Sequence, residues 1–363
     1  MIKTAVIGCG GMGNHHARVL AQMANVKVVG VCDPIEAKAR PLGEAVGVPW
    51  CVDYRTLLER ADAVWICTEP FNRLAVVTDA AAAGKHIFTE KPIARDLREA
   101  DAMIAAAARA RVKYMLGYVL RFTNPYRLLR DTLAAGELGE LVSCWTRRFM
   151  PIDMSTLWYG WQEKSGGVLL DFGSHDLDWL LWLGGPARTV FTQTFRVRPT
   201  MHADEHAQTV IVFERGGIAT CEVSWSSYLS ESSVGVVGTR GAMIVGLDGK
   251  VRKRVGDGKE TVVDVESAMA VDPAGNVGQR AAAGGIETVA ARNETIQQHF
   301  FRCIEEDLDP IPSAAEGRQV LATVLAMHKS ARTGRSVVVA GIKEVACRPL
   351  PRRAARAVSG VRG

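Results

Sequence analysis

The sequence predicts an α/β protein with two domains: a doubly wound parallel sheet, followed by an α+β domain with a large, mostly antiparallel open sheet. Up to about residue 120, apolar strand-like segments alternate with helix-like segments, which predicts βαβ units. A glycine-rich loop follows the first of these strands. Further on, strand-like segments lie close together between short turns, which favours an antiparallel sheet. The 363 residues also suit two domains of ordinary size.

The first third of the chain contains five expected strands and five expected helices. Parallel strands need crossover connections, and right-handed crossovers place helices on both faces of the sheet. We therefore expect a Rossmann domain over residues 1–121. The strands are expected at 2–7, 26–32, 62–67, 86–89 and 112–117, and the helices at 12–24, 35–46, 54–60, 72–83 and 96–110.

Residues 122–340 are expected to form the second domain. Two helices close it, and the second begins with a capping box formed by Ser313 and Glu316. The Gly/Ala-rich segment 264–287 is expected to be a long loop. Helices are expected at about 124–134, 168–183, 288–307 and 314–333, with an aromatic loop at 155–165 and strands at 139–149, 188–198, 207–215, 217–227, 233–239 and 242–247.

The net charge of +5 is concentrated at the C-terminus. From residue 343 onward the chain carries six basic residues and one acidic residue, so this segment accounts for 6 − 1 = 5 charges and the remainder is about neutral. Residues 341–363 have little apolar surface to bury, and we expect a basic, disordered tail. Nucleic-acid binding through the tail is an alternative, but no basic patch interleaved with aromatics supports it.

The cysteines and the apolar segments indicate a cytoplasmic protein. None of the eight cysteines is spaced as a zinc or redox pair, so we expect free thiols in a reducing compartment and no metal site. No secretory signal is visible. No apolar run reaches the ~18 residues typical of a membrane span, so no membrane partner is expected.

The glycine-rich loop has the G-x-G-x-x-G spacing of a dinucleotide-binding turn. Such a turn needs glycine for a tight bend, for close approach of the pyrophosphate and for helix–strand contact. The next strand ends in Asp33, whose carboxylate can bind ribose hydroxyls and would repel a 2′-phosphate. NAD is therefore expected rather than NADP, although Lys38 and Arg40 could still help to bind a phosphate. The expected coenzyme residues here are Gly8, Gly10, Gly11, Met12, Gly13 and Asp33.

Two further segments carry reactive side chains. Lys91 follows the fourth expected strand of the parallel sheet, where ligands bind in doubly wound folds. Asp171, His175 and Asp178 are spaced i, i+4 and i+7, so one helix would present them on one face. A histidine with a carboxylate one turn away can act as a general base. The alternative is that these residues have no catalytic role. Lys91 would then be a surface lysine, and the helix would begin with acids that complement its dipole and a half-buried histidine.

The whole pattern resembles the Gfo/Idh/MocA family of oxidoreductases over about residues 2–340. The segments that carry the resemblance are Gly8 to Gly13, Ala83-Gly84-Lys85-His86, Glu90-Lys91-Pro92, Gly117-Tyr118 with Arg121-Phe122, and Gly166-Gly167 with Asp171, His175 and Asp178.

The resemblance implies roles for these residues. Lys91 would contact both the nicotinamide ribose and the substrate, Asp171 would hydrogen-bond the substrate, and His175 would take the hydroxyl proton. It also implies a cis Lys91–Pro92 peptide and a homodimer or homotetramer formed through the second sheet. Thr68 and Glu90 join the expected coenzyme residues. Tyr118, Arg121, Trp158 and Trp161 are expected substrate residues, although packing is the alternative role for the tryptophans.

The implied activity is oxidation, with NAD, of a secondary hydroxyl of a sugar, inositol or related polyol. Two alternatives stay open: internal redox chemistry with retained NAD (elimination, epimerisation or glycoside cleavage), and a non-catalytic NAD- or sugar-binding regulator. The chain departs from the family pattern at Glu69 and Arg73, where members commonly read Thr-Pro-Asn or similar with a histidine shortly after. Both residues would lie near the nicotinamide and could change coenzyme fit or substrate charge preference.

Overall fold

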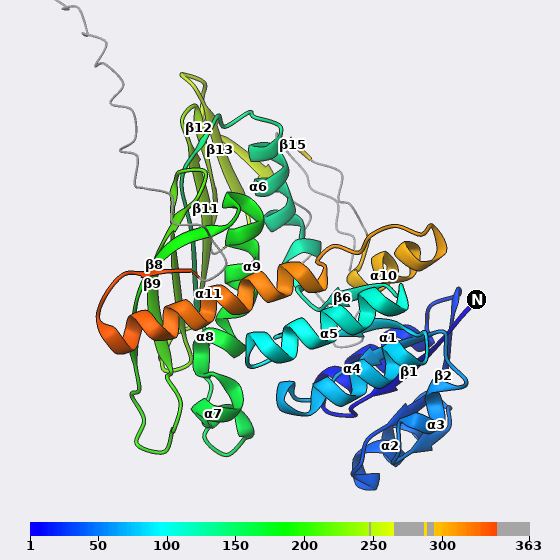
Figure 1. Ribbon diagram of the computed structural model, residues 1–363. Coiled ribbons are helices and arrows are strands. Elements are labelled where there is room, and N and C mark those ends of the chain that lie inside the picture. The colour runs from blue at the N-terminus through cyan, green and yellow to red at the C-terminus, as the bar shows by residue number, and fades with distance from the viewer. Residues whose placement is uncertain (247, 265–286, 289–293, 340–363) are drawn as a thin grey trace, which may run out of the picture.

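The computed structural model describes residues 1–246, 248–264, 287–288 and 294–339 (Figure 1). Nearly all of the expected loop at 264–287 and the whole of the expected basic tail at 341–363 lie outside the described residues. None of the helices in the described ranges is both long enough and apolar enough to cross a membrane.

The first sheet has six parallel strands in the order β3-β2-β1-β4-β5-β6, which confirms the predicted doubly wound domain. The strand order reverses between β1 and β4, and ligands of such sheets bind at this switch point. The prediction missed the two-residue edge strand β3. The strands are β1 (Ile2–Ile7), β2 (Val26–Cys32), β3 (Trp50–Cys51), β4 (Ala63–Ile66), β5 (His86–Thr89) and β6 (Tyr114–Leu116).

Helices connect these strands as the alternation predicts. The expected helix at 72–83 is preceded by a separate 3₁₀ turn, η1 (Pro70–Asn72). The helices are α1 (Gly11–Ala21), α2 (Glu36–Val46), α3 (Arg55–Leu58), α4 (Arg73–Ala82) and α5 (Leu97–Ala110).

The second sheet has ten described strands in the order β15-β14-β13-β12-β11-β7-β10-β9-β8-β16. It is mostly antiparallel, as predicted, but β7 pairs in parallel with β10, and β14 pairs in parallel with β15. The strands are β7 (Leu141–Phe149), β8 (Ala187–Phe195), β9 (His206–Phe213), β10 (Ile218–Ser224), β11 (Glu231–Gly238), β12 (Gly241–Val245), β13 (Val251–Val255), β14 (Thr261–Asp264), β15 (Glu287–Thr288) and β16 (Val337–Val338).

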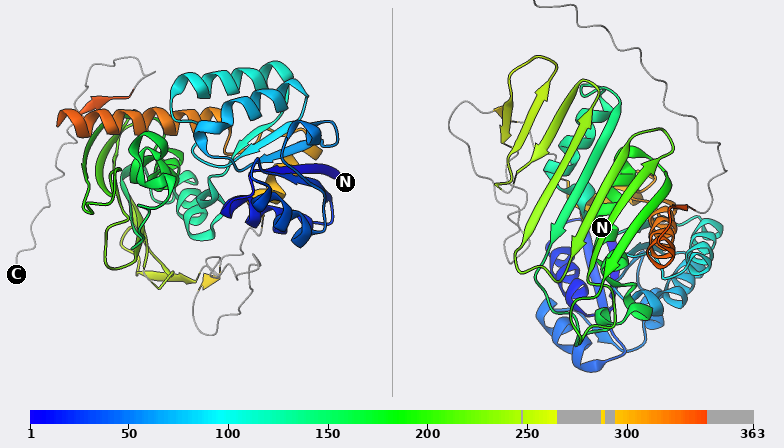
Figure 2. Two further views of the ribbon diagram at one scale, coloured as in Figure 1. Left: turned by 90° about the horizontal axis from the view of Figure 1, so that it is seen from below. Right: turned by 90° about the vertical axis from the view of Figure 1, so that its left-hand side faces the viewer.

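Helices cover one face of the second sheet, while the right-hand view of Figure 2 looks onto its other face, where the strands lie in front. Alternating burial along β8 and β9 fits this arrangement, because a one-sided sheet buries every second side chain. The helices that contact the sheet include α6 (Asn124–Ala134), α8 (Gly167–Asp171) and α9 (Gly173–Gly184). The short elements η2 (Val119–Phe122), η3 (Trp158–Gly160) and α7 (Gln162–Ser165) pack against other helical elements.

The two C-terminal helices connect the domains. The long helix α11 (Ala314–Thr333) begins at a capping box, as predicted, and runs from beside α5 to β8 (Figure 1). Helix α10 (Ile296–Glu305) returns to the first sheet, where Phe300 and Phe301 pack against Trp65. The helix predicted at 288–307 begins too early, because residues 287–288 form β15 and α10 begins at Ile296.

Candidate active site

The glycine loop between β1 and α1 has a backbone conformation that can bind an anion. A Cβ at Gly13 would lie 1.8 Å from the carbonyl oxygen of Gly8, so glycine is required for this helix–strand contact. Gly8 itself has φ +94°. A Cβ at Gly10 or Gly11 would meet nothing within 4 Å. No side chain caps α1 and its first turn carries no acid, so its first N–H groups are available to a phosphate.

Asp33 is fixed at the end of β2 by the backbone of two neighbouring segments. Its carboxylate oxygens accept hydrogen bonds from the N–H groups of Cys9 and Ile35, each at 2.9 Å. The side chain is buried and lines the same cavity as the glycine loop. Lys38 and Arg55 also line this cavity, so a carboxylate and two cations lie along the same wall.

A cavity of about 760 Å³ joins Asp33 and the glycine loop to the ends of β4 and β5. We call it the first cavity. Every residue predicted to bind the coenzyme lines it except Gly13, which lies under the loop. Its lining includes Gly8, Gly10, Gly11, Met12, Asp33, Thr68, Glu69, Glu90, Lys91, Leu157, Trp158, Tyr159 and Asp171.

Lys91 and Asp171 meet at the far end of the first cavity. The Lys91 ammonium donates to the carbonyl oxygen of Asp171 at 2.7 Å and to its carboxylate Oδ1 at 3.2 Å. The two residues are 80 positions apart in the chain, and both side chains are largely buried. The Lys91–Pro92 peptide is cis, as the resemblance implies. A cation held in this way can stabilise negative charge that develops on a substrate oxygen.

His175 lies one helical turn beyond Asp171. Its ring meets the ring of Tyr118 edge-on, with the centroids 6.1 Å apart, and its Nδ1 atom is buried without a hydrogen-bond partner among the described residues. Burial lowers the pKa of His175 well below its usual value, and the charges of Lys91 and Arg148 act in the same direction. The imidazole is therefore neutral near pH 7, which is the form that can accept a proton.

The helix predicted at 168–183 is interrupted at Phe172, which separates α8 from α9. Asp171 belongs to α8, whereas His175 and Asp178 belong to α9. Asp178 does not join the other two: its carboxylate accepts hydrogen bonds from Arg121 at 2.8 and 2.6 Å. The prediction that one continuous helix presents all three side chains on one face is therefore wrong, because the helix is broken at Phe172 and Asp178 pairs with a buried arginine from another element.

Arg121 and Tyr118, two of the predicted substrate residues, are both buried and do not line the first cavity. Besides Asp178, Arg121 donates to Glu316 of α11 at 2.5 Å. Burial raises the pKa of Asp178 to about 6, although Arg121 opposes this shift. The Tyr118 hydroxyl has no described partner, and burial raises its pKa well above the usual value. Arg121 therefore pairs with two carboxylates inside the fold and does not face the first cavity.

The two predicted tryptophans are placed differently. Trp158 lines the first cavity and stacks on Tyr159, with the ring centroids 3.9 Å apart. Trp161 stacks instead on His202 at 4.2 Å and does not line that cavity. Packing against His202 is therefore the contact that the structure gives Trp161.

Glu90 takes part in a buried chain of hydrogen bonds. Its Oε1 lies 2.7 Å from Nε2 of His16, and Nδ1 of His16 lies 3.2 Å from the amide nitrogen of Gln297 on α10. Burial alone would raise the pKa of Glu90, but the hydrogen bond and charge of His16, together with Lys91, lower it. Glu90 also accepts the backbone N–H of Lys91 at 3.2 Å, so this chain fixes the segment that carries Lys91.

Arg73, one of the two departures from the family pattern, is the first residue of α4, and its side chain is buried. Its guanidinium donates to the carbonyl oxygens of Thr68 and Glu90 at 2.6 and 2.5 Å, and to that of Pro92. It therefore ties the ends of β4 and β5 together. Glu69 lines the first cavity. The sequence contained no signal for the His16 or Arg73 contacts, because each joins segments that only the folded sheet brings together.

Two family models match the chain in sequence. Residues 2–118 match the model described as "Oxidoreductase family, NAD-binding Rossmann fold", and residues 126–244 match the "GFO/IDH/MocA C-terminal domain". The chain is 26% identical over 345 residues to D-apiose dehydrogenase from Paraburkholderia graminis, covering 92% of this chain and 89% of that protein. It is 28% identical over 257 residues to scyllo-inositol 2-dehydrogenase (NAD(+)) from Bacillus subtilis, covering 68% and 74% respectively.

The fold is also similar to that of solved structures. Levoglucosan dehydrogenase in complex with NADH and levoglucosan aligns with a TM-score of 0.83 at 22% identity, covering 94% of this chain and 100% of the other. At this identity the likeness concerns the fold.

Proposed function

This chain belongs to the Gfo/Idh/MocA oxidoreductase family, and on that premise we propose that it transfers hydride between NAD(H) and a secondary hydroxyl of a sugar, inositol or related polyol. Relatives named as dehydrogenases of apiose and inositols support this substrate class. The observation that carries the proposal is the Lys91–Asp171 pair at the end of the cavity bounded by the glycine loop.

The open positions Gly10 and Gly11, the uncapped α1 and the anchored Asp33 fit a dinucleotide. When bound, NAD supplies the hydride acceptor. In our proposal Asp171 holds the Lys91 ammonium so that it hydrogen-bonds the reacting hydroxyl and stabilises negative charge on its oxygen. The neutral imidazole of His175 accepts the hydroxyl proton. Trp158 provides an apolar wall for the ring of the substrate.

The test is NADH formation by the purified chain with a panel of inositols, aldoses, sugar acids and amino sugars. Replacement His175→Ala should lower turnover by ~10²–10⁴-fold, the usual scale for general acid–base catalysis, and leave NADH affinity unchanged. His206→Ala, in the second sheet away from the first cavity, is the matched control and should keep wild-type turnover. Wild-type turnover in His175→Ala would contradict the assignment, and NAD that stays bound without NADH release would favour internal redox chemistry.

We propose NAD rather than NADP as the coenzyme, because the Asp33 carboxylate would repel a 2′-phosphate at its end of the first cavity. Lys38 and Arg55 line the same cavity, so the preference is expected to be finite. Asp33→Asn should bring the dissociation constants for NADH and NADPH closer together. Titration of both coenzymes by fluorescence measures the change, and an unaltered ratio would contradict the role of Asp33.

We also propose a cytoplasmic homodimer or homotetramer formed through the uncovered face of the second sheet. Phe191 and Val210 are paired across β8 and β9 and remain exposed on that face, and Ile218 is exposed on β10. All cysteines of the described segments are free thiols, which suits a reducing compartment. Light scattering should give a dimer or tetramer mass, and Phe191→Lys should shift it toward the monomer. A monomeric wild-type chain would contradict this assembly.

A further inference from the structure

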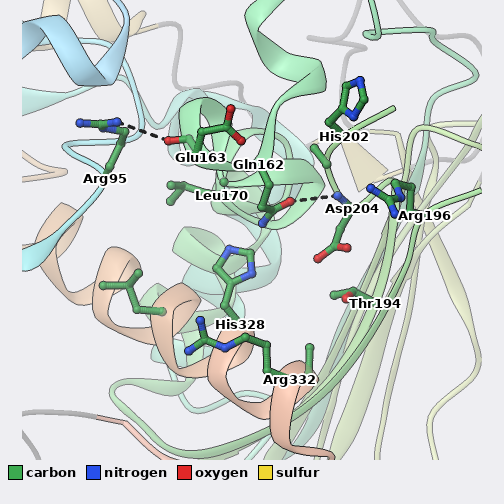
Figure 3. A pocket seen from close by; sticks show the side chains of 14 residues that line it. Arg95, Gln162, Glu163, Leu170, Thr194, Arg196, His202, Asp204, His328 and Arg332 are labelled. Atoms are coloured by element: carbon green, nitrogen blue, oxygen red, sulfur yellow. Dashed lines mark hydrogen bonds between the residues drawn. The ribbon is translucent and has the colours of Figure 1, made fainter. Parts of the chain in front are cut away.

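A second cavity, of about 590 Å³, lies between α11, the end of β8 and α7 (Figure 3). It shares no lining residue with the first cavity. The two are neighbours across α8, because Leu170 lines the second cavity and Asp171 lines the first. Its volume falls in the ~300–1,000 Å³ range of small-molecule sites, so the space is large enough for a ligand of monosaccharide size.

The walls of the second cavity carry an excess of positive charge. Three guanidinium groups, from Arg95, Arg196 and Arg332, face two carboxylates, those of Glu163 and Asp204, which leaves 3 − 2 = 1 net positive charge. Arg95 donates to the carbonyl oxygen of Glu163 at 3.3 Å and also forms an ion pair with Glu99, which does not line the cavity, at 3.8 Å. Arg196 and Arg332 make no ion pair or hydrogen bond through their side chains within the described part of the chain. Their donors are available to an oxyanion.

Several polar groups with unused hydrogen-bonding capacity lie deeper in the second cavity. The Nε2 atom of His328 is buried and has no hydrogen-bond partner among residues that the structure describes. Burial lowers the pKa of His328 although Asp204 opposes this, so its ring is neutral near pH 7. Gln162 accepts the backbone N–H of Asp204 through Oε1 at 2.9 Å, which leaves its NH₂ group as a donor. In Figure 3 the side chain of His328 extends from α11 toward Gln162, while the Arg332 guanidinium lies on the side of His328 that faces away from Asp204 and Arg196.

We propose that the second cavity binds a small hydroxylated oxyanion, such as a sugar acid or a sugar phosphate. The oxyanion binds through charge-assisted hydrogen bonds to the guanidinium of Arg196, on the β8 side of the cavity, or to that of Arg332, on the α11 side. The NH₂ group of Gln162 and the ring nitrogen of His328 hydrogen-bond to hydroxyls of the ligand. The carboxylate of Asp204 accepts hydrogen bonds from other ligand hydroxyls. A neutral sugar leaves the two guanidinium groups unused and binds more weakly.

Isothermal titration calorimetry of the full chain with gluconate, glucose 6-phosphate and glucose tests this site. At least one of the two oxyanions should bind at least about tenfold more tightly than glucose, because one hydrogen bond to a charged group contributes about that factor. Which oxyanion binds more tightly distinguishes a carboxylate from a phosphate site. The double variant Arg196→Met/Arg332→Met should lose that advantage. Arg335→Met, an exposed arginine just beyond α11 that does not line the cavity, should not.

The variant Lys91→Met separates this site from the first cavity. It should retain oxyanion binding, whereas loss of binding in Lys91→Met would place the ligand in the first cavity and overturn the proposal. The proposal is equally overturned if neither oxyanion binds, or if the double variant binds both as the wild type does. Circular dichroism confirms that the double variant is folded, and if it is not, Arg196→Met and Arg332→Met are titrated singly.

Discussion

Replacement Arg121→Met tests whether this arginine stabilises the fold or contacts the substrate. The change keeps much of the aliphatic side chain and removes two hydrogen bonds to Asp178 and one to Glu316. Each hydrogen bond to a charged group contributes about 1.5–3 kcal/mol. The full sum is not expected, because Asp178 can take up a proton when its partner is lost. We expect the free energy of unfolding to fall by about 3–5 kcal/mol, the range for breaking a buried ion pair.

The loss should depend on pH with a definite sign. The pKa of Asp178 is about 6 in the folded chain, above the value of about 3.9 in an unfolded one. A raised pKa stabilises the fold at low pH, and that contribution is lost as the pH rises through the folded value. Without Arg121 the folded pKa rises further. The variant should therefore lose more stability near about pH 8 than near about pH 5, where Asp178 is protonated in both proteins.

Urea unfolding followed by tryptophan fluorescence measures both effects. Arg130→Met is the matched control, because Arg130 stacks on the Trp182 ring as Arg121 does, at 4.8 against 5.2 Å, but pairs with Asp131 near the surface. Its cost should stay below about 1 kcal/mol. If both variants lose the same stability at both pH values, and Arg121→Met instead raises KM for the substrate, the structural role of Arg121 is refuted.

Three further predictions concern the coenzyme loop and the catalytic segment. Gly13→Ala should lower the melting temperature, because its Cβ would lie 1.8 Å from a backbone oxygen. Gly10→Ala should leave the melting temperature unchanged but weaken NADH binding, since its Cβ points into open space. Equal melting temperatures for the two variants would refute this distinction. His16→Leu should lower the free energy of unfolding by about 1–3 kcal/mol at neutral pH by leaving the buried Glu90 carboxylate without its partner; urea titration with unchanged stability would argue against the pairing. Because the pKa of His175 is lowered, kcat/KM should be flat around neutral pH and fall only in acid as the imidazole takes up a proton, and a fall already at about pH 7 would contradict the neutral state.

Much of the fold follows from local sequence patterns. Alternating apolar strands and helices predict the parallel sheet, and the glycine spacing predicts the turn above α1, because a tight turn and a close helix–strand contact depend on a few adjacent residues. The short strands β3 and β16 were missed, since two residues give no periodicity. Strand β13 was missed as well, because three of its five residues are Arg or Lys.

Only the tertiary structure decided which side chains meet. The sequence alone placed Lys91, Asp171 and His175 in the candidate site, and through the family resemblance it assigned them roles. The sequence did not show that Asp178 forms an ion pair with Arg121, 57 residues away. Nor did it show that Glu316, 195 residues from Arg121, pairs with the same guanidinium. The parallel pairing of β7 with β10 and the contact of His16 with Glu90 are of the same kind. Local patterns fix helices, strands and turns through backbone geometry, whereas partners distant in the chain are chosen by packing and by the need to pair buried charges.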